Sequence, residues 1–174
     1  PRSAGMNRFT WDLTLPGAWS ASVAQSGRNG PTIVPGKYQV RLTAGSVTTT
    51  QPLTVQIDPR AAADGITLAD LQAQFTHNVK VRDLVSEVNR LVATLDDQRK
   101  RFAAGGSSAA DTLRGTNALR ATIVTPAIRY SKPELQSHVQ YLYSLTSQAD
   151  QRIGRDATER YVTLRKELDV TMAK

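Results

Sequence analysis

The stretch IVPGKYQVRLTAGSVTTTQPLTVQIDPR, residues 33–60, decides how the chain folds. Its apolar residues Tyr38, Val40 and Leu42 alternate with polar ones, which is the period of a half-buried strand. The Gly-Ser pair at 45–46 fits a two-residue hairpin turn with glycine at its first central position. The stretch therefore predicts a β-hairpin.

The two-residue turn also sets the register of this hairpin. It pairs Ala44 with Val47 and, further along, Tyr38 with Leu53. The odd-numbered apolar residues of the second strand then stay on one face. Pro52 has no backbone N–H to donate, so it indicates a sheet edge or a bulge.

The residues before the hairpin offer few strands. Phe9, Trp11 and Leu13 alternate with polar residues and predict one half-buried strand, with Trp11 in the core. Residues 16–35 are rich in Gly, Ser, Asn and Pro and predict a long loop, with one short strand near residues 19–23.

The composition changes at Arg60, and helical spacing follows. Thr67 with Asp70 three residues later predicts a helix start. An apolar stripe continues over residues 68–102, which gives a helix roughly 50 Å long. We therefore expect two modules, residues 1–60 and residues 61–174.

Three further segments complete the helical module. Residues 103–110 are expected to be a flexible linker before a helix over about 112–124. Ser131 and Asp156 are the expected start signals of the last two helices. Short connections favour an antiparallel bundle of three to four helices. The expected fold class is α+β: a small incomplete antiparallel sandwich followed by this bundle.

Composition limits the classes of function. The chain has 174 residues, 40% hydrophobic and 21% charged, which is typical of a globular protein. Its net charge of +7 is spread along the chain, and the only basic triplet is Arg99-Lys100-Arg101, so a nucleic-acid surface is not expected. The absence of cysteine excludes disulfides. No apolar run is long enough for membrane insertion.

No set of residues indicates catalysis. The two histidines, His77 and His138, lie in helical patterns without a second ligand at metal-binding spacing. Asp96 and Asp97 are adjacent on a helix and diverge, so they cannot chelate together. The serines of residues 105–108 lack the context of a nucleophile elbow. We expect no enzyme activity, no cofactor and no metal.

Four residues are candidate contacts for a ligand or partner: Trp19, Tyr143, Arg99 and Arg101. Trp19 lies in a polar loop, where it could stack on a sugar ring or cover the end of the sandwich. A carbohydrate-binding module is therefore the alternative function. Tyr143 and Tyr141 are two apart on a helix and cannot form one stacking platform, so at least one faces outward or toward a partner.

Two motifs carry a family resemblance. GMNRFTWDL at residues 5–13, followed by VPGKY at residues 34–38, resembles the immunoglobulin-like domain of flagellar hook-capping proteins. Together with QPLTVQIDPR at residues 51–60, it is still more similar to the C-terminal region of secreted bacterial proteins with sortilin-type or BNR/Asp-box repeats. Those proteins are often labelled glycosyl hydrolases. The resemblance covers roughly residues 5–100 well and the later helices loosely.

The resemblance implies a tail module of a secreted or periplasmic protein, whose N-terminal propeller would be its partner. The hydrolase label transfers to no residue, because the chain has no Asp box. An immunoglobulin-like sandwich has about seven strands, so its first two are expected upstream of Pro1, together with any targeting segment. The gap is expected to be filled by a homodimer through the open β edge or by the long helix.

Overall fold

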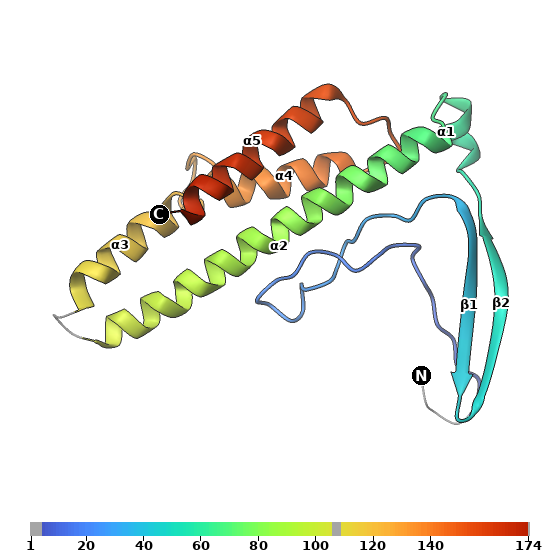
Figure 1. Cartoon of the computed structure of the whole chain (residues 1–174), viewed down its shortest axis with the longest axis horizontal. Coiled ribbons are helices and arrows are strands. Elements are labelled where there is room, and N and C mark those ends of the chain that lie inside the picture. The colour runs from blue at the N-terminus through green and yellow to red at the C-terminus, as the bar shows by residue number, and fades with distance from the viewer. Residues whose placement is uncertain (1–4, 106–108, 174) are drawn as a thin grey trace.

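A computed structural model describes residues 5–105 and 109–173. In these residues the chain is mixed α+β, as expected, with a two-stranded antiparallel sheet and five helices (Figure 1). The elements in order are β1 (Gly36–Ala44), β2 (Val47–Val55), α1 (Pro59–Ala63), α2 (Leu68–Ala104), α3 (Ala110–Ala121), α4 (Leu135–Ser147) and α5 (Arg155–Met172). The expected module boundary at Arg60 falls inside α1.

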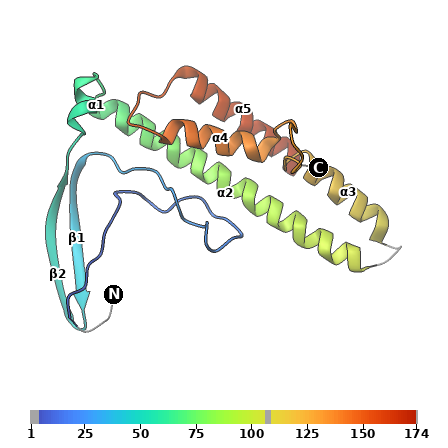
Figure 2. The ribbon, with the colours of Figure 1, turned by 180° about the vertical axis from the view of Figure 1, so that it is seen from behind.

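The hairpin is confirmed with its predicted register. Ala44 pairs with Val47 and Tyr38 with Leu53. Gly45 takes a left-handed φ of 61°, which a glycine adopts without the steric penalty of a side chain. The hairpin extends away from the helices in both views of the ribbon (Figures 1 and 2).

The strand expected at Phe9, Trp11 and Leu13 is absent, and so is the short strand near residues 19–23. Instead, residues 13–33 double back on themselves through bonds such as Leu15 N–H to Pro31 O, 2.9 Å. At two glycines the two halves of this segment approach too closely for a side chain. A Cβ on Gly17 would lie 1.7 Å from Arg28 O, and one on Gly30 would lie 1.6 Å from Leu15 O. We call residues 13–33 the docked segment.

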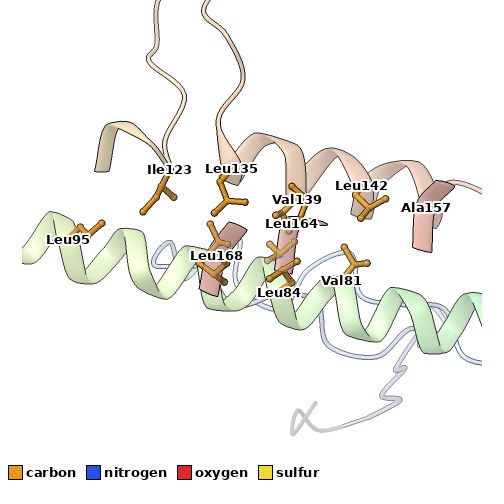
Figure 3. Packing of buried hydrophobic residues seen from close by; sticks show 12 residues of the cluster. Val81, Leu84, Leu95, Ile123, Leu135, Val139, Leu142, Ala157, Leu164 and Leu168 are labelled. Carbon is orange, nitrogen blue, oxygen red and sulfur yellow. The ribbon is translucent and has the colours of Figure 1, made fainter. Parts of the chain in front are cut away.

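The helical body, α2 to α5, is organised by α2. Its N-terminus is the predicted one: Thr67 and Asp70 form a reciprocal capping box. The apolar stripe of α2 packs against α3, α4 and α5, and Figure 3 shows the buried side chains between them. The shared core comprises Val81, Leu84, Val85, Val88, Leu95, Ile123, Leu135, Val139, Leu142, Ala157, Leu164 and Leu168.

The predicted helix starts at Ser131 and Asp156 are wrong. The α4 helix begins at Leu135, and its early N–H groups find partners in the preceding turn: Glu134 N–H donates to Thr125 Oγ1 and Gln136 N–H to Ile123 O. The N-cap of α5 is Gly154 and makes no side-chain cap bond, while Asp156 lies in the first turn.

The ends of the other helices also differ from the prediction. The α3 helix spans Ala110–Ala121, earlier than expected. Ile123 lies beyond it, fully buried in the core. Part of the predicted linker, residues 106–108, lies outside the described residues, and residues 103 and 104 belong to α2.

Trp11 is not a core residue, contrary to expectation. It is 38% exposed and meets the Tyr38 ring edge-on at 6.4 Å between centroids. The long helix does not cover the sheet either, since Val40 is 51% exposed and Leu42 68%. Among the described residues the two strands form the only sheet, so no second sheet lies opposite them to bury Trp11, Val40 and Leu42.

Candidate interaction surface

The hairpin has two chemically different faces. One face, called here the apolar face, also holds Thr49 and Gln51 but carries the larger apolar side chains of both strands: Tyr38, Val40, Leu42, Val47, Leu53 and Val55. The opposite face carries Lys37, Gln39, Arg41 and a row of threonines. Three residues of the apolar face, Val40, Leu42 and Val47, are more than half exposed. Exposed apolar side chains gathered on one face mark a candidate interaction surface.

The N-terminal residues extend this apolar surface. Trp11 stacks edge-on against Tyr38, and its Nε1–H donates to Thr14 O at 2.9 Å. Asp12 accepts bonds from the N–H and hydroxyl of Thr14, and the Thr14 hydroxyl is the main reason that the pKa of Asp12 is lowered. Phe9, at 80% exposure, adds further uncovered apolar surface.

Trp19 holds the docked segment on α2. Its backbone N–H donates to Ser86 Oγ at 3.0 Å, and its backbone carbonyl accepts from Asn89 Nδ2 at 2.8 Å. The Arg90 guanidinium lies 5.5 Å from the centre of the indole ring. One face of the ring is therefore occupied by a cation. The carbohydrate-binding alternative stays a prediction.

Tyr143 fastens the same segment from α4. Its hydroxyl donates to Asn29 O at 2.7 Å. Burial raises the pKa of Tyr143 to about 12, so the phenol keeps its proton as a donor. Tyr141, two residues earlier, is 68% exposed. Trp19, from within the docked segment, and Tyr143, from α4, thus both hold the docked segment against the helices.

The two arginines lie elsewhere, towards the C-terminal end of α2. Arg99 is engaged with Asp96 at 3.0 Å and Asn117 at 2.6 Å. The hydrogen bond from Arg120 is the largest cause of the lowered pKa of Asp96. Arg101 is exposed in the last turn. The structure therefore does not bring the four predicted contact residues together.

Sequence reasoning missed a cavity of about 570 Å³ at the base of the hairpin. It lies between the docked segment, the start of α2 and the end of α4, and its lining includes Ile33, Val55, Phe75 and Asn78. Asn78 is buried, and its Oδ1 has no hydrogen-bond partner among the described residues. Only a non-local arrangement creates this cavity, so no local sequence pattern signals it.

The residues considered for catalysis or metal binding are placed as follows. His77 is buried and meets the Tyr161 ring edge-on at 6.2 Å, and burial lowers the pKa of its imidazole. No group of three or more His, Asp or Glu side chains within residues 5–105 and 109–173 is placed to hold a metal ion. No helix in the described part of the chain is both long and apolar enough to cross a membrane.

Comparison with known proteins adds no family: no family model, curated protein or solved structure matches the chain. The resemblance to sortilin-type and BNR/Asp-box proteins therefore stays a prediction.

Proposed function

We propose that this chain is a non-catalytic module that mediates protein interaction or assembly. The observation that carries the proposal is the apolar face, which leaves Leu42 at 68% and Val47 at 65% exposure. Contiguous exposed apolar surface is characteristic of binding sites, because leaving it in water is unfavourable by roughly 25 cal/mol for each Å².

The proposal also includes the domain architecture in which the hairpin and the helices take part. The hairpin is the last strand pair of an immunoglobulin-like sandwich, and the helical body is an antiparallel bundle that serves as its support. A bond from the Tyr38 hydroxyl to Val34 O, 2.5 Å, supports the first part. Immunoglobulin-like domains use a tyrosine in this way, bonding back to the chain a few residues upstream.

The parent protein is then a secreted or periplasmic protein of the sortilin-type or BNR/Asp-box class, by resemblance alone. Its N-terminal propeller carries any substrate site, and the apolar face of the hairpin packs against it. The charge of the opposite face, from Lys37 and Arg41, keeps that side in water.

Calorimetric titration of the chain with the separately purified propeller region of its parent tests the proposal. Replacing Val40 and Leu42 with threonine puts a β-branched residue that suits a strand at both positions and removes apolar area, so binding should fall at least about tenfold. Arg41→Thr changes the opposite face of the same strand and is the matched control, which should bind normally. Equal binding by both variants, or turnover of a glycoside or peptide by the chain, would contradict the proposal.

A further inference from the structure

The two edges of the hairpin differ in their backbone hydrogen-bonding groups. In an antiparallel pair closed by a two-residue turn, the residues that flank the turn bond to each other. Ala44 and Val47 are therefore a bonded pair, and alternate residues from there point their N–H groups inward. The remaining residues point theirs outward: Lys37, Gln39, Arg41 and Thr43 on β1, and Thr48, Thr50, Pro52 and Thr54 on β2.

Only the β1 edge offers an unbroken row of donors. Pro52 sits at an outward position of β2 and has no N–H, so it interrupts strand addition on that side. The four outward residues of β1 are all exposed. Among the described residues, no backbone hydrogen bond outside the hairpin reaches β1.

The sequence of β1 is complementary to itself in one antiparallel register. With the two-fold axis at Val40, all nine residues of Gly36–Ala44 are paired. Arg41 then lies opposite Gln39 of the second copy. Lys37 lies opposite Thr43 of the second copy, and on the other face Tyr38 lies opposite Leu42.

The neighbouring registers are disfavoured by charge. An axis at Gln39 sets Lys37 opposite Arg41 of the second copy, and an axis at Arg41 sets the two Arg41 side chains opposite each other. Like charges directly opposite on paired strands are destabilising. The positions of the two cations therefore select the register centred on Val40.

We propose that two copies of this chain join β1 to β1, antiparallel, in this register. Two-stranded sheets are marginal in water, and three or more strands with an apolar face are needed for independent stability. The four-stranded sheet formed by the dimer meets that requirement and makes the two apolar faces continuous. This inference rests on the proposed function only in taking the hairpin as the interacting element.

Single-cysteine crosslinking tests the register, because the chain has no cysteine of its own. In Val40→Cys the two thiols face each other in a non-bonded pair, with Cα atoms about 4.5 Å apart, within disulfide reach. In Leu42→Cys, the matched control on the same face, the thiols are four residues apart along the strands, about 13 Å. Under mild oxidation Val40→Cys should form covalent dimer at least about tenfold faster. Equal rates, or no covalent dimer, would overturn the proposal.

Sedimentation at micromolar concentration tests the edge. Arg41 and Thr50 face each other across the hairpin, and both point their N–H outward. A proline at either position therefore removes no hairpin bond, but only Arg41→Pro removes a donor from the β1 edge. The unsubstituted chain and Thr50→Pro should be dimers and Arg41→Pro a monomer, with unchanged helical circular dichroism.

The two proposals fail in different ways. A monomeric chain that still binds the propeller region through Val40 and Leu42 would refute only the dimer. A β1-paired dimer whose threonine variants bind the propeller region as well as the unsubstituted chain would refute only the proposed function.

Discussion

At the scale of single residues, the side chain of Gln74 in α2 bonds backbone groups at the C-terminal end of α4. Its Nε2 donates to Thr146 O at 2.8 Å and Ala149 O at 2.7 Å, and its Oε1 accepts from Gln151 N–H at 3.2 Å. The last carbonyls of any helix lack partners within it. A buried side chain of α2 thus caps the C-terminus of α4.

Replacing Gln74 should therefore be more harmful than replacing its neighbour Asn78. Gln74→Met keeps the shape but leaves Ala149 O and Gln151 N–H without this partner, so the free energy of unfolding should fall by about 1–3 kcal/mol. Asn78→Leu removes one bond to Thr146 O, which keeps Gln74, and also removes the unpartnered Oδ1. Asn78→Leu should therefore lower the free energy of unfolding by less than about 1 kcal/mol. Urea unfolding measures both, and the reverse order would contradict this account.

His77 should make the stability depend on pH. Burial first, and the positive charge of Lys80 second, lower its pKa in the folded chain from the ordinary value of 6.5. The unfolded chain therefore binds a proton at higher pH than the folded one. The contribution that neutral His77 makes to the free energy of unfolding is fully present above pH 6.5. It is lost as the pH falls through the lower pKa of the folded chain.

Urea titrations from about pH 7.5 to about pH 5 check this expectation against His77→Phe, which keeps a ring against Tyr161 but cannot titrate. The variant should lose less stability over this range than the unsubstituted chain. The comparison uses the slope alone, so a constant packing difference does not affect it. Identical slopes would mean that the His77 pKa is not lowered by folding.

At the scale of elements, helix starts separate local from non-local capping. Thr67 Oγ1 accepts from Asp70 N–H at 3.1 Å, whereas the Ser131 hydroxyl donates to Ile128 O in an exposed turn. Thr67→Ala should therefore reduce the free energy of unfolding by about 1 kcal/mol. Ser131→Ala should change it by no more than about 0.5 kcal/mol. A larger effect at Ser131 would restore it as the cap of α4.

The same contrast explains what the sequence could predict. The hairpin register and the start of α2 depend on residues within a few positions of each other, so local patterns were sufficient. The start of α4 at Leu135 depends on Ile123 and Thr125, which lie 12 and 10 residues earlier in the chain. No local rule identifies such partners, and Ser131-Lys132-Pro133-Glu134 imitates a cap motif without forming one.

The apolar face of α4 provides a second test at this scale. Leu142 is 3% exposed in the shared core, while its neighbour Tyr141 is 68% exposed. Leu142→Ala should lower the free energy of unfolding by about 2–5 kcal/mol, through lost burial and the cavity left behind. Tyr141→Ala is the control and should stay within about 0.5 kcal/mol. Similar losses for both would mean that another face of α4 is buried.

At the scale of the whole molecule, the physical division does not follow the change in composition. The docked segment lies among the first 60 residues, yet it is fastened to the helices: Ala18 packs against the helical core, and Arg82 donates to Pro16 O at 3.2 Å. The hairpin, from the same stretch of sequence, extends away from them (Figure 1). The sequence could not show this, because the docking uses backbone groups of a segment without periodicity.

Two glycine substitutions test this division. Far-UV circular dichroism follows the unfolding of the helices in urea, at a protein concentration low enough for the chain to be monomeric. A Cβ at Gly17 would collide with Arg28 O in the docked segment, so Gly17→Ala should lower helical stability by about 1–3 kcal/mol. Gly45→Ala imposes left-handed strain on the hairpin turn, about 1–2 kcal/mol, but has no atoms nearby to disturb. Because the turn lies far from α2, that strain should open the hairpin locally and leave the helical transition unchanged. A matching loss of helical stability in both variants would mean that hairpin and helices unfold as one cooperative unit.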